Sequence, residues 1–394
     1  MTDFVSELIK KVKPSATIAV SMKAAELRAK GKDVIGLGAG EPDFDTPDHI
    51  KAAAIEAIKQ GKTKYTAVDG TPELKQAVVD KFSRENGLDF GLNQVLVSCG
   101  AKHSISNLLA AVLNPGDEVI IPAPYWVSYP DMVLLAGGQS VIVETTQEQD
   151  FKISPQQLEN AITDKTRLII LNTPSNPTGK AYRKAELQAL GEVLLKYPQV
   201  MIATDDIYEH IYWGDEEITN LGILFPELME RMVFINGVSK AYAMTGWRIG
   251  YAAGPVDVIT AMRKIQSQAT SNPCSISQAA SVAALNGSQD CLEPMKKAFK
   301  ERHDWLIDAL NDIPGFSCIA GEGAFYAFPN IEAVIAKIED VETDVDFSTW
   351  LLENAEVAVV PGTPFGVPGH VRLSFATSMD NLREAVDRIK QSLV

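Results

Sequence analysis

Residues 200–205 read VMIATD, a short apolar run that ends in an acidic residue. Similar apolar runs recur between about residues 95 and 255, and they alternate with stretches whose apolar residues lie three and four apart. This alternation is typical of βα units around a mostly parallel sheet. We predict helices that include 104–113, 155–162 and 184–195, and strands at 95–98, 118–121, 140–144, 167–172, 200–204, 232–236 and 248–252. The predicted fold class is α/β, with a doubly wound sheet that binds ligands at the carboxyl ends of its strands.

The strand alternation stops near residue 290, where a long amphipathic segment, 295–310, follows. Beyond it the pattern is α+β, with helices at 347–354 and 379–393 and short strands at 316–319, 325–328, 357–360 and 371–376. A helix near 18–30 is expected to pack beside this second part. Because 394 residues exceed the usual size of one compact unit, we predict two domains. The large domain would span 48–290, and the small domain would combine 1–47 with 291–394.

Composition excludes several classes of partner. The formal net charge of −15 would repel a nucleic-acid backbone, so no nucleic acid is expected. The four cysteines are widely spaced, with no CxxC pair and no histidine at ligand spacing, so they indicate free thiols in a reducing compartment and no metal site. Neither a leader pattern nor 18 consecutive apolar residues occur, and we expect a soluble cytoplasmic protein with no membrane partner.

The segment 238–250 reads VSKAYAMTGWRIG and carries a lysine, Lys240, eight residues before an arginine, Arg248. An amine attacks a carbonyl only when it is unprotonated, so a reactive lysine needs an apolar or cation-flanked pocket that lowers its pKa. An arginine supplies a fixed fork of donors for a phosphate. A phosphorylated aldehyde such as pyridoxal phosphate (PLP) needs both features. Taken alone, the two residues also fit a solvated face.

Candidate cofactor-binding residues follow two other predicted strands. Gly100, Ala101 and Lys102 open a helix after the strand at 95–98, where backbone N–H groups favour a phosphate, although an ordinary strand-to-helix turn has the same pattern. Asp205 ends the strand at 200–204. It either pairs a pyridinium N–H, which keeps the ring an electron sink, or caps a helix. Tyr208 would then donate to the phenolic oxygen of the ring.

Three further residues have a functional and a structural interpretation. Asn176 lies in a loop that two prolines make rigid, and it either reaches the ring oxygen of a cofactor or bonds only its own backbone. Trp126 follows the strand at 118–121 and either stacks on a flat heteroaromatic ring or packs in the core. Arg372 interrupts an apolar strand, so it needs a carboxylate from the protein or from a substrate.

The order and spacing of these segments resemble the class I aminotransferase family of fold-type I PLP enzymes, and within it the aspartate aminotransferase branch of bacteria and archaea. The resemblance runs from about residue 12 to 393. Its most specific marks are KPSAT at 13–17, GAGEPDF at 38–44, KYT at 64–66, NPTG at 176–179, the lysine segment and VRLS at 371–374. It implies a seven-stranded sheet, PLP as the cofactor, amino acids and 2-oxo acids as substrates, and a homodimer with shared active sites.

The resemblance also implies a role for each matching residue. Lys240 would hold the cofactor covalently and move the proton. The ring would be held by Asp205, Tyr208, Asn176 and Trp126. The other cofactor contacts would come from Gly100, Ala101, Lys102, Ser239, Arg248 and, from the neighbouring subunit, Tyr65. The substrate would be bound by Arg372, Asn176, Trp126 and the backbone at Gly40, and covered by Lys13, Ser15 and Thr17.

Two positions depart from many relatives. Gly237 stands where they carry a hydroxyl three residues before the lysine, and Ala101 offers no hydroxyl either. Phosphate binding is therefore expected to depend on Lys102, Arg248 and backbone N–H groups. Lys13 resembles a position associated with prephenate in some relatives, but it also fits a solvated lysine in a basic run. No arginine that would bind a substrate side-chain carboxylate from the other subunit can be placed.

The expected activity is a ping-pong exchange of the amino group between aspartate and 2-oxoglutarate, with prephenate as a further acceptor. The alternatives within the family are an aromatic or alanine preference, or a β-lyase. A PLP-binding regulator is disfavoured by the acidic charge and by the lack of a helix-turn-helix before residue 13. A nicotinamide-dependent oxidoreductase is disfavoured because the glycines at 36–40 have the wrong spacing for a dinucleotide loop.

Overall fold

The computed structural model describes residues 4–393. Its helices are α1 (Ala16–Ala29), α2 (Asp48–Lys59), α3 (Pro72–Asn86), α4 (Ala101–Val112), α5 (Tyr129–Leu135), α6 (Pro155–Ala161), α7 (Lys184–Leu195), α8 (Leu221–Leu224), α9 (Val256–Ala269), α10 (Ser275–Asn286), α11 (Leu292–Asn311), α12 (Glu332–Ile335), α13 (Asp344–Asn354) and α14 (Met379–Ser392). Its strands are β1 (Ile35–Gly36), β2 (Val95–Ser98), β3 (Glu118–Pro122), β4 (Gln139–Val143), β5 (Thr166–Asn172), β6 (Met201–Asp205), β7 (Met232–Gly237), β8 (Gly250–Ala253), β9 (Tyr326–Ala327), β10 (Val357–Ala358), β11 (Val360–Pro361) and β12 (Val371–Ser374).

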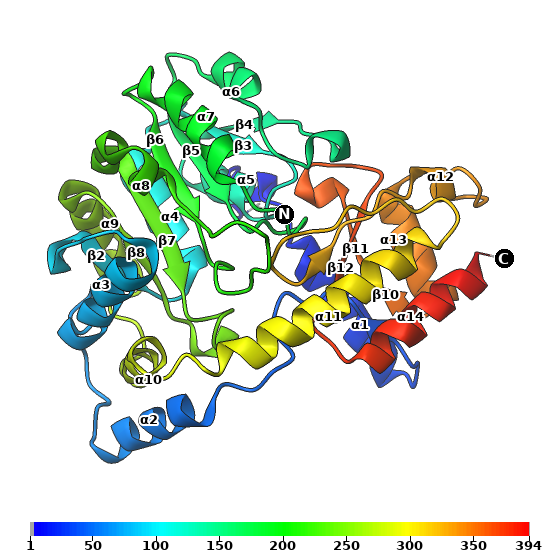
Figure 1. Ribbon diagram of the computed structural model, residues 1–394, viewed down its shortest axis with the longest axis horizontal. Helices are drawn as coiled ribbons and strands as arrows, with labels where there is room; N and C mark the ends of the chain where they lie inside the picture. Colours follow the sequence, from blue (N-terminus) through cyan, green and yellow to red (C-terminus); the bar gives the residue numbers. More distant parts are fainter. Residues whose placement is uncertain (1–3, 394) are drawn as a thin grey trace.

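A seven-stranded sheet organises the first part of the chain, in the order β2-β8-β7-β6-β5-β3-β4 (Figure 1). Neighbouring strands from β4 to β7 run parallel, and β8 runs antiparallel to both β7 and β2. The central strands are buried on both faces, which explains their nearly continuous apolar sequences. The predicted seven-stranded, mostly parallel sheet is confirmed.

Helices cover both faces of this sheet, as expected of a doubly wound fold. One core cluster contains apolar side chains of α3, α7 and α10, including Leu74, Leu190 and Ala280. The other contains side chains of α4 and α9, including Leu108 and Met262. The strand side chains divide between the two clusters, because successive residues of a strand point to opposite faces.

The second part of the chain is built on two small sheets. β1 pairs with β10 in parallel, and β11, β12 and β9 form an antiparallel sheet. The long helix α11 leads from the seven-stranded sheet toward this part, and α14 lies beside it (Figure 1). A third core cluster joins side chains of α11, α13, α14 and β12. The predicted α+β pattern is thus present, and α1 packs beside it against β1, β10 and β11.

Several predicted bounds differ from the structure, and the strand predicted at 357–360 is divided between β10 and β11, which belong to different sheets. The strand predicted at 248–252 begins only at Gly250, because Arg248 adopts a left-handed conformation with a φ of 55° after the turn at Thr245–Trp247. The predicted strand at 316–319 forms only an isolated bridge from Ser317 to Asn330, where Pro329 interrupts the partner segment. The helix predicted from 104 begins three residues earlier, at Ala101.

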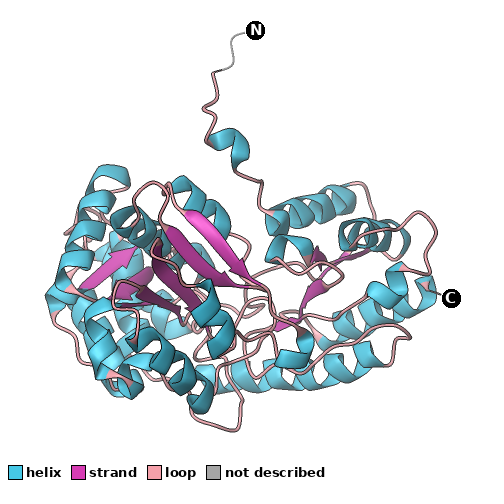
Figure 2. Cartoon of the chain, turned by 90° about the horizontal axis from the view of Figure 1, so that it is seen from above, coloured by secondary structure: helices cyan, strands magenta, loops and turns pink. Residues whose placement is uncertain are grey.

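Residues 4–11 reach away from the rest of the chain (Figure 2). They include a short turn of helix, Ile9–Lys11, and none of the residues in that turn is buried. Among the described residues, no helix is both long and apolar enough to cross a bilayer. All four cysteines are free thiols, as the sequence predicts.

Candidate active site

A cavity of about 730 Å³ lies where the carboxyl ends of β5 and β6 face the second part of the chain. Most of the predicted site residues line it, namely Ser15, Thr17, Gly40, Ala101, Lys102, Trp126, Asn176, Asp205, Tyr208, Ser239, Lys240, Arg248 and Arg372. Gly100 lies directly beside this wall. Lys13 and Tyr65 lie outside it. The cavity therefore brings together side chains that are separated by up to several hundred positions in the sequence.

Lys240 follows β7 and lines the cavity. Its Nζ donates to the backbone oxygen of Gly40. The same nitrogen lies 5.9 Å from the ring centroids of both Tyr208 and Phe325. The amine is thus enclosed by aromatic surface on one side and by the N-terminal part of the chain on the other.

Burial lowers the pKa of the Lys240 amine to about 8. The carboxylate of Glu41 opposes this shift, whereas the guanidinium groups of Arg248 and Arg372 strengthen it, and Asp205 adds a smaller opposing effect. An amine with a pKa near 8 is partly unprotonated at neutral pH. The structure therefore gives Lys240 the property that the sequence required of a reactive lysine.

Asp205 ends β6 inside the protein, and its side chain is incompletely paired. Its Oδ2 accepts a hydrogen bond of 2.6 Å from the Tyr129 hydroxyl. Its Oδ1 is buried without a partner among the described residues. Burial raises the pKa of this carboxyl to about 6. A buried acceptor in this state needs an N–H donor or a proton, which fits the protonated nitrogen of a pyridine ring.

Arg372 is fully buried in β12, with 1% of its side chain exposed. Its Nη1 donates to Asn176 Oδ1 at 2.9 Å, and its Nη2 donates to the Gly38 oxygen at 2.7 Å. Its Nε has no partner, and within residues 4–393 no carboxylate forms an ion pair with it. Because a buried cation is costly without an anion, this side chain is suited to an anionic substrate.

Two tyrosines and two asparagines connect these groups. The hydroxyls of Tyr208 and Tyr326 are 2.9 Å apart, and the Tyr326 ring lies 4.3 Å below the Arg372 guanidinium carbon. Asn172 Oδ1 accepts from the Asn176 backbone N–H at 2.9 Å. These contacts connect Asn176 directly, and Tyr208 through Tyr326, to Arg372.

The turn into α4 forms an anion-binding cradle with Arg248. Gly100 has a φ of +88°, and a Cβ there would lie 2.5 Å from Arg248 Nη2, so only glycine permits this approach. Arg248 Nη1 donates to the Thr245 oxygen at 2.9 Å, which directs the guanidinium toward the N-terminus of α4. The helix begins at Ala101, so its free N–H groups and the guanidinium face the same space.

Lys102 adds a second cation to this cradle. Its Nζ lies 4.8 Å from the Trp126 ring centroid. Burial lowers the pKa of this amine, and the charge of Arg248 contributes to the shift. Two cations held side by side at a helix N-terminus favour a phosphate, so the residues present fit PLP at both its ring and its phosphate.

The N-terminal wall of the cavity contains more residues than the sequence predicts. Ser15 and Thr17 lie at the start of α1, as the resemblance implies, and the next turns of α1 add Ile18, Ser21 and Met22. Lys13 is exposed, and its backbone N–H donates to Asp131 Oδ1 at 3.3 Å. The Tyr65 side chain is 91% exposed. The roles expected for Lys13 and Tyr65 stay predictions.

Sequence reasoning missed four residues of this site. Tyr129, Tyr326 and Glu41 gave no usable signal, because tyrosines in apolar segments and a carboxylate in a turn are common. Asn172 could have been found: it ends β5 in register with Asp205, the last residue of β6. A polar residue at the end of a buried parallel strand marks the ligand edge.

Comparisons with known proteins agree with this geometry. The family described as aminotransferase class I and II matches residues 32–389. The aspartate/prephenate aminotransferase of Nitrosomonas europaea is 58% identical over 393 residues, covering 98% of this chain and 99% of that protein. The crystal structure of the aspartate aminotransferase from Rhizobium meliloti has a TM-score of 0.96 at 48% identity, covering 100% of this chain and 99% of that one.

A second solved structure, the aspartate aminotransferase from Thermus thermophilus with maleate, has a TM-score of 0.94 at 44% identity. It covers 99% of this chain and 100% of that one. Family match, identity and fold all extend over nearly the whole length. The chain therefore belongs to the class I and II aminotransferase family.

Proposed function

We propose that this chain transfers the amino group between L-aspartate and 2-oxoglutarate, with prephenate as a further amino-group acceptor. One observation carries the proposal: a partly unprotonated lysine lines the same cavity as a buried carboxylate with a free oxygen and a buried arginine with no anionic partner among the described residues. Such a site matches an aldehyde cofactor and the α-carboxylate of an amino acid. The names of similar proteins, which include aspartate and aspartate/prephenate aminotransferases, support the choice of substrates.

The residues that would hold PLP follow from the fit described above. Asp205 would accept the N–H of the ring nitrogen, Tyr208 and Asn176 would bind the ring oxygen, and Trp126 would stack on the ring. The phosphate would be bound by Gly100, Ala101, Lys102, Ser239 and Arg248. PLP, when bound, supplies an electron sink that stabilises negative charge at the substrate Cα.

The side chains of the protein then have three tasks. Arg372, supported by Asn176, binds the substrate α-carboxylate and so orients the Cα–H bond. Lys240 Nζ accepts the proton from Cα and later returns one, which its lowered pKa permits near neutral pH. The buried position of Asp205 and Tyr208 excludes water from the reacting side of the cavity.

The charges of the cavity support a substrate with an α-carboxylate. Besides Lys240, three cationic side chains line it, namely Lys102, Arg248 and Arg372. Lys102 and Arg248 would face the phosphate of the cofactor and Arg372 the α-carboxylate, so the choice of aspartate rests on the names of the similar proteins. Ile18 and Met22 add apolar surface on the α1 side, which suits the ring of prephenate.

We further infer a homodimer in which Tyr65 reaches the phosphate site of the partner subunit. The support is the exposure of this aromatic side chain, 91%, in a single chain. We also infer a large domain at 48–290, a small domain formed by 1–47 and 291–394, and a cytoplasmic location. The core clusters around the seven-stranded sheet and around α11 support this division.

The test is the visible absorption of the PLP-loaded protein, recorded while aspartate, glutamate, alanine and phenylalanine are added singly without any oxo acid. Aspartate and glutamate should bleach the colour fast, and the other two slowly. When prephenate or 2-oxoglutarate is then added to the aminated protein, the visible absorption should return. A protein that stays colourless with PLP, or coloured with every amino acid, would contradict the proposal. Fast bleaching by phenylalanine alone would contradict the aspartate preference.

A further inference from the structure

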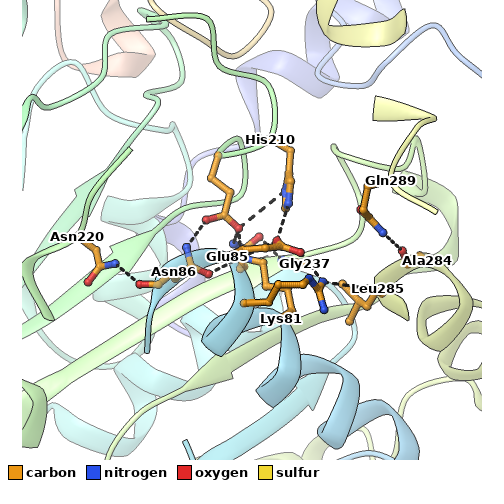
Figure 3. A network of polar contacts seen from close by, with 12 residues as sticks. Lys81, Glu85, Asn86, His210, Asn220, Gly237, Ala284, Leu285 and Gln289 are labelled. Atoms are coloured by element: carbon orange, nitrogen blue, oxygen red, sulfur yellow. Dashed lines mark hydrogen bonds and ion pairs between the residues drawn. The ribbon is translucent and has the colours of Figure 1, made fainter. Parts of the chain in front are cut away.

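A buried ionic cluster lies beyond the cavity wall, and none of the roles proposed above uses it (Figure 3). Lys81 of α3 is fully buried, and its ammonium contacts the carboxylate of Glu209, whose side chain is 7% exposed. Lys81 Nζ also donates to Asn86 Oδ1 at 2.6 Å, and Asn86 Nδ2 donates to Glu209 Oε2 at 2.7 Å. One helix therefore fixes the Glu209 carboxylate at two points.

The same carboxylate is connected to both segments that carry the reactive groups. Glu209 directly follows Tyr208 in the chain. Asn236 Nδ2 donates to Glu209 Oε1 at 2.6 Å, and Asn236 Oδ1 accepts from the Gly237 backbone N–H at 2.7 Å. Asn236 lies in β7, four residues before Lys240. Glu209 thus joins the segment of Tyr208 to the strand that leads to Lys240.

The chain is also held on the other side of Lys240. The hydroxyl of Tyr242 donates to Gln289 Oε1 at 2.7 Å. The His210 ring lies 6.1 Å from the Tyr242 ring, and its Nε2 is 2.9 Å from Glu85 Oε2. Figure 3 shows the side chains of His210, Glu85 and Lys81 close to one another. The lysine is therefore held between anchored residues on both sides.

Burial explains why this cluster can fix a geometry. A buried ammonium without its carboxylate is strongly unfavourable, so Lys81 holds Glu209 in one position. A buried ion pair adds little net stability compared with apolar packing, and fixing one conformation is a use that stability alone does not explain. The hydrogen bonds to Asn86 and Asn236 add direction, because each amide donates along a defined line.

We propose that Glu209 is a positioning residue, which through Lys81 and Asn236 fixes the placement of Lys240 relative to Tyr208. This inference rests on the proposed roles of Tyr208 and Lys240 in binding PLP. Neither Glu209 nor Asn236 lines the cavity. Their effect is therefore expected on the geometry of the reactive groups and not on substrate binding.

The experiment uses Asn236→Ala in the full-length, PLP-loaded protein, because this variant removes one link and leaves the pair of Lys81 and Glu209. We expect the pH midpoint of the visible absorption to shift by about 0.5 unit or more, since the lysine and the tyrosine no longer meet the cofactor in the same geometry. We expect kcat for aspartate to fall by about 10- to 100-fold, with KM changed by less than about threefold.

The matched control is Asn220→Ala. Asn220 belongs to the same network, since its Nδ2 donates to the Asn86 backbone oxygen at 3.2 Å, and it also caps α8. It touches neither the Tyr208 segment nor the Lys240 segment. Its loss should lower the melting temperature and leave the absorption midpoint and kcat as they are. A general loss of stability is thereby separated from a loss of positioning.

A second variant, Glu209→Asp, keeps the charge opposite Lys81 and shortens the side chain by one carbon. It should shift the pH midpoint of the visible absorption in the same direction as Asn236→Ala. If Asn236→Ala does not fold, the midpoint of Glu209→Asp tests the positioning role by itself. The inference is overturned if the folded variants have a lower melting temperature but the wild-type midpoint and a kcat within about twofold of the wild type. A wild-type protein that gives no visible band with PLP would instead overturn the proposed function.

Discussion

The two walls of the cavity are built in opposite ways. The wall formed by strand ends is buried, with 5% of Asp205 and 1% of Arg372 exposed. The wall formed by α1 is open, with 58% of Ile18 and 68% of Met22 exposed. Ala24 is the only described residue of α1 that is buried. One wall belongs to the protein core, and the other is attached to its surface.

Because of this difference, the buried wall is suited to the chemical step and the open wall to the entry of the substrate. Buried side chains with fixed hydrogen bonds hold reacting groups in one geometry, which catalysis requires. A helix with few buried contacts can move at little cost in free energy, which suits a cover that closes over a substrate. Substitutions in the strand-end wall should therefore have large effects, and substitutions in α1 small ones.

The largest effect is expected for Lys240→Ala. Removing the amine removes both the attachment of the cofactor and the proton acceptor, so the rate of bleaching by aspartate should fall by at least about 10⁴-fold. Lys240→Arg should be equally inactive, because a guanidinium stays protonated. Stopped-flow absorption measures the rate, with the exposed Lys264→Ala as the control. Substantial turnover by Lys240→Ala would move the chemistry to another residue.

Arg372→Leu should come next. It removes a buried charge-assisted contact to the substrate carboxylate, so kcat/KM for aspartate should fall by about 10²- to 10³-fold. Arg372→Lys should be only partly active, because an ammonium lacks the planar fork. Steady-state kinetics measures both variants, and Arg388→Lys, which lies outside the cavity, should leave kcat/KM for aspartate unchanged. Equal kcat/KM values for Arg372→Leu and the wild type would show that the carboxylate binds elsewhere.

Asp205 gives a prediction about stability and pH. In the cofactor-free protein burial raises the pKa of this carboxyl to about 6, above its ordinary 3.8. Deprotonation therefore favours the unfolded state, and the free energy of unfolding should fall as pH rises from about 4 to about 6. Asp205→Asn abolishes this loss, so the cofactor-free variant should be more stable than the wild type by up to about 3 kcal/mol at pH 7.5.

Urea unfolding of both cofactor-free proteins at pH 4 and pH 7.5 tests this prediction. The two proteins should differ by less than about 1 kcal/mol at pH 4, where the carboxyl is protonated in the folded state and about half ionised in the unfolded state. If Asp205→Asn is less stable than the wild type at pH 7.5, the free carboxylate oxygen has a partner in solution and the burial argument is wrong.

The smallest effect is expected for Met22→Ala in α1. Because this side chain is mostly exposed, the free energy of unfolding should change by less than about 0.5 kcal/mol. The kcat/KM for aspartate should stay within about twofold of the wild type, and that for prephenate should fall a few-fold, since the apolar wall is reduced. A loss for aspartate as large as that of Arg372→Leu would contradict the division between the two walls.

Most of the fold and of the site could be predicted from particular local features. The run at 200–205 predicts both a buried strand and a carboxylate at its end, and β6 ends at Asp205. The pattern at 371–374 predicts a strand with a buried arginine that needs an anion, and Arg372 has no anionic partner among the described residues. In each case a charged residue within an apolar run is the signal.

Other features had no local signal. Tyr129 and Tyr326 lie in apolar surroundings, and only their hydroxyl contacts distinguish them from core residues. The left-handed conformation of Arg248 delays the start of the strand predicted at 248–252 to Gly250, and the contact of its guanidinium with Gly100 lies 148 positions away in the sequence. The cluster of Lys81 and Glu209 has no signal in the sequence, because its partners lie 128 positions apart.

The sequence by itself determined the alternation of buried strands and amphipathic helices, and the residue types at the strand ends, because periodicity and charge act over a few neighbouring positions. Only the tertiary structure decided which of these ends meet. Arg372 contacts Gly38 across 334 positions, and Lys240 contacts Gly40 across 200. Contacts between such distant segments leave no periodic trace in the sequence, so the geometry of the cavity and the lowered pKa of Lys240 arise only when the chain is folded.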